Sequence, residues 1–151
     1  MENQLVVFEV ANERYGVNIT AVESIIKLQT ITTVPQAPQF VKGVTNLRGV
    51  VLPVIDLRQR FGLPQTASTK DTRIVVVEMD GGTVGMIVDA VAEVLRVPDE
   101  AIEPPSPLVI TVDSIFIAGI AKLDEQLVIM LDLDKVLTAQ EQGELKAVPA
   151  T

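Results

Sequence analysis

The chain contains an internal repeat, which limits its possible folds more than any other feature of the sequence. Two blocks align without gaps, residues 5–27 with 74–96 and residues 43–57 with 119–133. Within these blocks Gly16 falls on Gly85, and the Asp-Leu pair at 56–57 falls on the pair at 132–133. Chance agreement between aliphatic strands rarely places glycines and Asp-Leu pairs in the same order. The sequence therefore predicts two similar units in one chain.

The composition indicates that both units are built mainly from strands. Apolar residues make up 48% of the 151 residues but aromatic residues only 3%, so Val, Ile and Leu must form the core. β-branched side chains favour strands, and a single small β unit buries too little surface to be comfortable alone. We expect one mainly β domain over 1–151. Its two intertwined β subdomains, roughly 1–66 and 70–138, should pack together around a groove, followed by a polar tail, 139–151.

Local patterns predict the individual elements. The expected strands are 5–10, 14–19, 50–55, 73–79, 83–97, 114–123 and 126–131, and the expected helices are 20–27, 56–59 and a last one from 132 or 134 to 138. Thr20 and Glu23 form a capping-box pattern at the start of the first helix. Pro53 suggests an edge strand or a bulge, because proline donates no ladder hydrogen bond. The polar segment 65–71 is the best linker.

Charge and residue usage exclude several classes of function. The net charge is −8, which argues against binding to nucleic acid or to an anionic membrane surface. The chain has no cysteine and no histidine, which removes thiolate chemistry, the commonest general base and the commonest metal ligand. No apolar run is long enough to span a membrane, and the N-terminus does not resemble a signal peptide. We expect a cytoplasmic protein that is not an enzyme and has no cofactor, bound metal or membrane insertion.

The remaining polar motifs favour structural roles. Asp56 and Asp132 stand where helix N-caps belong. The segment 80–82 reads Asp-Gly-Gly, which is a hairpin turn, and the sequence contains no glycine-rich phosphate-binding motif. Two classes of function stay open at this point. One is a non-catalytic scaffold with apolar grooves, and the other is a β-barrel that binds a small ligand or serves as a noncatalytic subunit of an enzyme.

Arg48 is the residue that distinguishes the two copies. Arg48-Gly49 forms a turn before the expected strand 50–55, after a segment, 40–48, that is extended or briefly helical. The second copy has Asp-Glu at the matching positions, 124–125. Features that the duplicated halves share indicate a common fold, whereas features that differ between them indicate a function that only one copy has. Two interpretations of Glu23 remain open, as the capping partner of Thr20 or as an ion-pair partner of Arg48. Val22 is either a core residue or part of a groove.

The block GVTNLRGVVLPVIDLRQRFGL, residues 43–63, resembles the CheW family of bacterial chemotaxis coupling proteins. Segments 15–26, 84–95 and 128–137 are similar to the same family at the right spacing, so the resemblance covers nearly the whole chain. It implies two five-stranded SH3-like β barrels packed around a hydrophobic core, in agreement with the repeat.

The resemblance also implies an adaptor function. Proteins of this family connect the histidine kinase CheA, through its regulatory domain, to the cytoplasmic tips of methyl-accepting chemoreceptors in membrane-associated arrays. The receptor tip is a helical hairpin that lies in the groove between the barrels. The matching positions in this sequence are Val22, Glu23 and Arg48, with Gly43, Asn46 and Gly49 shaping their surroundings.

Overall fold

The structure, a computed structural model, describes residues 2–37, 40–79, 82–104, 116–123 and 126–136. Eleven strands account for most of these residues: β1 Glu2–Val10, β2 Glu13–Asn18, β3 Val22–Lys27, β4 Val41–Leu47, β5 Val50–Asp56, β6 Arg73–Met79, β7 Gly82–Val88, β8 Ala90–Pro98, β9 Ile102–Glu103, β10 Ile117–Leu123 and β11 Gln126–Leu131. The short helical elements are η1 Ile19–Ala21, α1 Leu57–Arg60, η2 Asp99–Ala101 and α2 Leu133–Val136.

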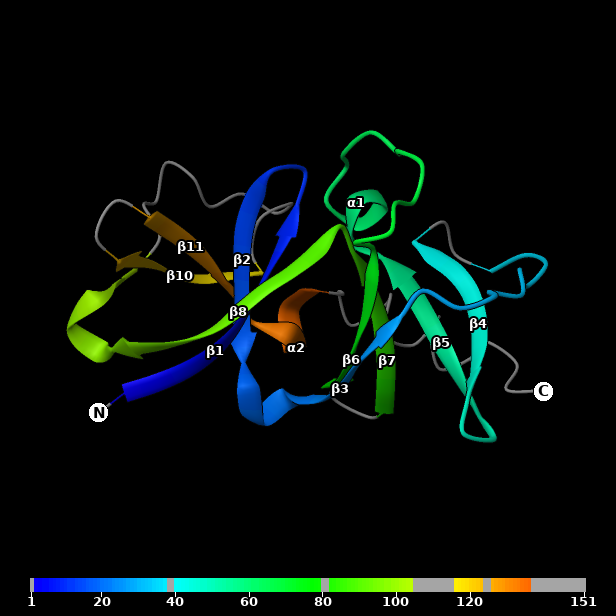
Figure 1. The fold of residues 1–151 in the computed structure, drawn as a ribbon, viewed down its shortest axis with the longest axis horizontal. Helices are drawn as coiled ribbons and strands as arrows, with labels where there is room; N and C mark the ends of the chain where they lie inside the picture. The colour runs from blue at the N-terminus through cyan, green and yellow to red at the C-terminus, as the bar shows by residue number, and fades with distance from the viewer. Residues whose placement is uncertain (1, 38–39, 80–81, 105–115, 124–125, 137–151) are drawn as a thin grey trace.

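The strands form two sheets that exchange hairpins between the two copies of the repeat. One sheet has the order β8-β1-β2-β11-β10-β9, and the other has the order β3-β6-β7-β5-β4. The first sheet combines the β1–β2 hairpin of the first copy with β8, β9 and the β10–β11 hairpin of the second copy. The other sheet combines the β6–β7 hairpin of the second copy with β3 and the β4–β5 hairpin of the first copy. Figure 1 shows the two sheets side by side, with α2 between them. The mainly β fold with two packed barrels is therefore confirmed, except that one sheet has six strands and not five, because the two-residue strand β9 adds to its edge.

The equivalent strands pair in equivalent ways. Tyr15 and Gly16 of β2 pair in parallel with β11, just as Gly85 and Met86 of β7 pair in parallel with β5. The segment 65–72, between α1 and β6, separates the two copies in the sequence. It does not separate the sheets, because β1 and β2 belong to the sheet that holds β8 to β11. The division of the chain into halves at 1–66 and 70–138 thus describes the repeat and not the sheets.

Both faces of the central strands β1 and β6 are buried, which explains their unbroken apolar runs. In β1, Leu5 and Val7 belong to a cluster inside one sheet, whereas Val6 and Phe8 belong to the large cluster that unites both sheets. The strand β6 divides its residues in the same way between the third cluster and the large one. Successive side chains point to opposite faces of a strand, so a strand covered on both sides needs no polar alternation.

Close packing explains the repeated glycine. A Cβ atom on Gly16 would lie 3.0 Å from Val128 Cγ1 of the neighbouring strand. A Cβ atom on Gly85 would lie 2.8 Å from Ile74 Cγ2 and 3.3 Å from Leu52 Cδ2. Leu52 and Val128 are matching residues of the repeat, so both copies use the glycine for the same close approach of strands.

Several local expectations were wrong. The expected helix 20–27 is the strand β3, which pairs with β6, preceded by the single turn η1. Asn18, and not Thr20, caps that turn by accepting a hydrogen bond from the Thr20 N–H group. The expected strand 83–97 is interrupted at Asp89, where β7 ends and β8 begins one residue later.

Proline 53 lies inside the sheet and not at its edge, because β5 has β4 and β7 as neighbours. The parallel pairing with β7 begins only at Val54, so Pro53 lies just before that ladder. The two expected N-caps are confirmed. The Asp56 side chain accepts hydrogen bonds from the Arg58 and Gln59 N–H groups of α1, and the Asp132 side chain accepts one from the Asp134 N–H group. The turns at 80–81 and 124–125, the segment 105–115 and the tail 139–151 lie outside the described residues.

Candidate functional site

Arg48 occupies the tip of the β4–β5 hairpin in a conformation that L-residues rarely adopt. Its φ angle is 53°, and the φ angle of Gly49 is 84°. Leu47 pairs directly with Val50, so these two residues form the whole loop, and positive φ at both positions is typical of a type I′ hairpin turn. The Asn46 side chain accepts a hydrogen bond of 2.9 Å from the Gly49 N–H group. The Arg48 side chain is exposed to solvent.

The other candidate residues lie in the same sheet as Arg48. Val22 is half-buried and packs against the large core cluster, and Glu23 is exposed next to it at the start of β3. Gly43 is buried in β4, where the ladder with β5 shifts its register. With its φ angle of 154°, a Cβ atom there would collide with the carbonyl oxygen of Thr32. The glycine is thus required by the backbone that passes over it.

The structure brings the candidates together only in part. β3 and β4 are opposite edge strands of their sheet, and the chain after β3 closes the barrel onto β4 through the Thr32–Val44 bridge. No ion pair joins Glu23 to Arg48 in the part of the chain that the structure describes. The expected pairing of these two residues is therefore absent, because Arg48 is solvated at a hairpin tip and needs no partner. The alternative role of Glu23, as the capping partner of Thr20, is also absent, because Glu23 belongs to the strand β3.

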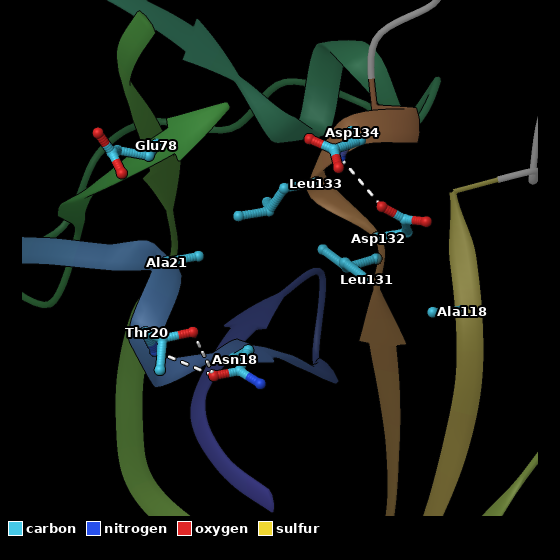
Figure 2. A pocket seen from close by; sticks show the side chains of 9 residues that line it. All are labelled: Asn18, Thr20, Ala21, Glu78, Ala118, Leu131, Asp132, Leu133 and Asp134. Atoms are coloured by element: carbon cyan, nitrogen blue, oxygen red, sulfur yellow. Dashed lines mark hydrogen bonds between the residues drawn. The ribbon is translucent and has the colours of Figure 1, made fainter. Parts of the chain in front are cut away.

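A hollow of about 480 Å³ lies where the two sheets meet, and we call it the junction hollow. Figure 2 shows the residues that line it: Asn18, Thr20, Ala21, Glu78, Ala118, Leu131, Asp132, Leu133 and Asp134. Glu78 comes from one sheet, Ala118 from the other, and Asp132 and Asp134 from the start of α2. The six candidates from the sequence do not line this hollow. Its lining contains three carboxylates and no basic side chain.

An ion pair between Arg58 and Asp89 lies at the positions of the repeat that match Asp134 and Thr20 of the junction hollow. Arg58 donates to both carboxylate oxygens of Asp89, from Nε at 3.0 Å and from Nη2 at 2.6 Å. Asp89 also accepts a hydrogen bond of 2.8 Å from the Ala11 N–H group, and Arg58 Nη1 donates to the Pro64 carbonyl oxygen. This network joins the β1–β2 turn, the β7–β8 junction, α1 and the linker.

The network shifts the protonation equilibria of both partners. The hydrogen bond from Arg58 is the main cause that holds the pKa of Asp89 below its ordinary value of 3.8, although burial opposes the effect. The same bond raises the pKa of Arg58. The pair is therefore charged at neutral pH, as expected for a structural lock. Sequence reasoning missed it because it assigned Asp89 to the middle of a strand.

Two exposed apolar side chains were also missed. Ile25 on β3 is 41% exposed and Val94 on β8 is 52% exposed. They are matching residues of the repeat, and each stands on the edge strand of its own sheet. The interpretation of 20–27 as a helix hid the alternation of β3, which leaves every second side chain exposed. Exposed apolar side chains at repeated positions are features of an interaction surface.

Within the described ranges, no group of three carboxylates is arranged to hold a metal ion, and no helix is long and apolar enough to cross a membrane. The sequence supplies neither histidine nor cysteine. The prominent polar groups are structural instead, namely N-caps, a turn and an ion pair. The two-sheet architecture offers surfaces and grooves between repeated units.

The comparison with known proteins identifies these features with one family. The CheW-like domain family matches residues 4–141. The chain belongs to the CheW-like family. The chemotaxis protein CheW of Bacillus subtilis (strain 168) is 37% identical over 146 residues, which cover 97% of this chain and 92% of that protein. The CheW protein of Klebsiella aerogenes is 34% identical over 140 residues, covering 93% of this chain and 84% of that protein.

A solved CheW structure has the same architecture. The scaffolding protein TtCheW from Thermoanaerobacter tengcongensis superposes with a TM-score of 0.85 and 42% sequence identity, covering 93% of this chain and 96% of that one. This CheW-like chain is accordingly a chemotaxis adaptor, a scaffold and not an enzyme. The resemblance found in the block at 43–63 is confirmed.

Proposed function

We propose that this adaptor couples the histidine kinase CheA to the cytoplasmic tips of chemoreceptors. The regulatory domain of the kinase is one partner, and the helical hairpin of a methyl-accepting receptor is the other. The receptor hairpin lies in the groove between the two barrels, and the protein works in the cytoplasm at membrane-associated receptor arrays. Membership of the CheW-like family carries this proposal, and the two packed sheets agree with it.

Six residues form the proposed receptor-binding surface: Val22, Glu23, Gly43, Asn46, Arg48 and Gly49. Arg48 supports the assignment most directly, because a non-glycine residue with positive φ costs conformational energy. The structure holds it there with a two-residue turn and with the Asn46 side chain. Such strain at an exposed cationic side chain is typical of a site that presents a group to a partner. The exposed Ile25 lies on β3, the strand of Val22 and Glu23, and adds an apolar contact for a helix.

The Arg48→Gly substitution tests this proposal. Glycine adopts positive φ without strain, so the variant should be at least as stable as the parent while it loses the guanidinium. We expect its affinity for a soluble fragment of the receptor tip to fall about fivefold or more, as at arginine hot spots in other interfaces. Activation of CheA by that receptor fragment should fall with it. Lys70→Ala is the control, because Lys70 is an exposed cation in the linker.

Calorimetric titration with the receptor fragment and a kinase assay with receptor, adaptor and CheA supply the two measurements. If Arg48→Gly binds the receptor fragment as tightly as Lys70→Ala does, Arg48 is not part of the surface. If neither receptor fragment nor CheA binds the parent protein at all, the coupling function itself is wrong.

A further inference from the structure

Neither half of the chain completes a sheet by itself. We call the described residues of 2–64 the first half and those of 73–136 the second half, and the segment 65–72 connects them. The β1–β2 hairpin of the first half lies between β8 and β11, which both belong to the second half. In the other sheet, the β6–β7 hairpin of the second half lies between β3 and β5 of the first half. Each half therefore needs strands of the other half on both sides of its hairpin.

The backbone pairing between the halves is extensive. The ladder between β1 and β8 joins eight residue pairs, and the ladder between β3 and β6 joins five. The parallel ladders, β2 with β11 and β5 with β7, add two and three pairs. The large core cluster also draws on both halves, for example through Phe8 and Val75. These contacts hold the two halves together, and they do not require the halves to belong to the same chain.

Polar contacts also join one half to the other. Arg58 of the first half binds Asp89 of the second half, with 2.6 Å between Nη2 and Oδ2. The Asp89 carboxylate accepts a further hydrogen bond from the Ala11 N–H group of the first half. Arg14 of the first half lies 3.3 Å from the carboxylate of Glu93 in the second half. A unit made from the first half of one chain and the second half of another would form all of these bonds.

The segment 65–72 connects the halves without taking part in the strand ladders. Its residues 65–71 are exposed. Gln65 donates to the Gln59 side chain, and Thr69 and Thr72 bond with each other. Within the described residues, none of its hydrogen bonds reaches beyond 59–73. The segment can therefore open without breaking a ladder, and eight extended residues span up to about 26–29 Å, enough to reach an adjacent unit.

We propose that this protein exchanges halves with a second copy of its own chain. In the resulting dimer, the first half of each chain completes the sheets of its partner's second half, and two opened linkers connect two complete units. Such an exchange is closed and symmetric, and it forms the contacts between the halves twice. The six residues of the proposed receptor-binding surface all lie in the first half, so each unit presents the whole surface. The exchange itself does not depend on that proposed function.

The concentration during folding selects between the two forms. Halves that are linked in one chain meet at a high effective concentration, so the monomer prevails when the chain folds in dilute solution. Folding at high protein concentration favours the exchanged dimer. Once formed, the dimer separates slowly, because separation requires the strand ladders of both units to break.

Charge reversal across the halves tests the exchange, because it changes which chains fit each other. Arg58→Glu and Asp89→Arg each place like charges together when a chain folds on itself. In an exchanged dimer of the two variants, one unit regains the native pair and the other contains the reversed pair. The two variants, one of them ¹⁵N-labelled, are refolded together from urea at high concentration, and native mass spectrometry identifies the dimer of mixed mass. We expect at least about tenfold more mixed dimer than in a control mixture.

Lys122 and Glu103 supply the matched control, because both lie in the second half with 3.2 Å between their charged groups. Exchange never separates two residues of one half, so a mixture of Lys122→Glu and Glu103→Lys gains nothing from it. Equal amounts of mixed dimer in the two mixtures, or only monomers in the first, would overturn the proposal. Immediate dissociation of the mixed dimer on dilution would also overturn it, since a dimer held by surface contacts alone behaves in that way.

A second pair keeps the test decisive if Arg58→Glu or Asp89→Arg does not fold. Arg14 and Glu93 also lie in different halves, and their side chains are 32% and 46% exposed, so Arg14→Glu and Glu93→Arg perturb the fold less. Their mixture should give about two- to fivefold more mixed dimer than the control mixture, the usual range for an exposed ion pair. No excess over the control would refute the exchange of halves.

Discussion

Removal of the Asp89 carboxylate should destabilise the protein more than removal of any exposed carboxylate. Asp89 accepts two hydrogen bonds from Arg58 and one from the Ala11 N–H group, so Asp89→Ala leaves three donors without their acceptor. The Arg58 side chain is 16% exposed and the Asp89 side chain is 34% exposed. The pair is therefore partly buried, and its contribution to the free energy of unfolding lies between those of a buried and an exposed ion pair.

The expected magnitude follows from these contacts. A hydrogen bond to a charged group contributes roughly 1.5–3 kcal/mol when it is shielded from water. An exposed ion pair contributes only about 0.2–1 kcal/mol. We expect Asp89→Ala to lower the free energy of unfolding by about 2–3 kcal/mol at neutral pH. Asp89→Asn should cost about half as much, because its amide oxygen still accepts from the Ala11 N–H group.

A double-mutant cycle separates the ion pair from the turn contact. Urea unfolding of the parent, Asp89→Asn, Arg58→Met and the combined variant gives the coupling between the two side chains. A coupling of about 1 kcal/mol is expected for a partly buried pair with two hydrogen bonds. Because the substitutions lie in one native network, the slope of the unfolding free energy with urea should not change.

The pH dependence has a definite sign. The pKa of Asp89 is lowered in the folded protein, so its stabilising effect is complete above the ordinary value of 3.8 and is lost as the pH falls through the folded pKa. The stability difference between the parent and Asp89→Asn should therefore be constant near neutral pH and shrink below about pH 4. A coupling near zero, or a difference that does not change in acid, would refute this account of the network.

Other predictions rest on single contacts. Gly85→Ala should destabilise by about 1–3 kcal/mol, because its Cβ would lie 2.8 Å from Ile74 Cγ2; urea unfolding measures the loss, and unchanged stability would contradict it. Gly43→Ala should lower the free energy of unfolding by more than Gly85→Ala does, because its Cβ would meet the backbone of Thr32, which cannot rotate away. A smaller loss of stability than for Gly85→Ala would contradict this expectation. Tyr15, the single tyrosine, should ionise above pH 10 in an absorbance titration, because burial, assisted by the charge of Glu13, raises its pKa.

The sequence predicted the architecture well where one pattern had one physical cause. The unbroken apolar runs of β1 and β6 reflect burial on both faces, and the N-cap aspartates reflect the helix starts that follow them. The helix expected at 20–27 failed because Thr20 and Glu23 imitate a capping box, whereas pairing with β6 determines the conformation of the segment. Tertiary pairing overrides a weak local signal of this kind.

Of the candidate site, only the turn at Arg48-Gly49 could be predicted from the sequence. Arg48-Gly49 forms the expected corner, but an ion pair with Glu23 was inferred from a burial that Arg48 does not have. The junction hollow and the Arg58–Asp89 lock depend on which copy supplies each hairpin. The repeat shows that two segments are equivalent, and it does not show which of them pairs with a third. That choice is decided by long-range packing.

The exchange of hairpins between the two copies has a consequence for folding during synthesis. During synthesis the β1–β2 hairpin leaves the ribosome before both of the strands that flank it in the sheet, β8 and β11. The early hairpin must therefore wait with both sides open to any strand that it meets. Rapid synthesis of this adaptor therefore favours protection of the unfinished chain until β11, which ends at Leu131, has left the ribosome.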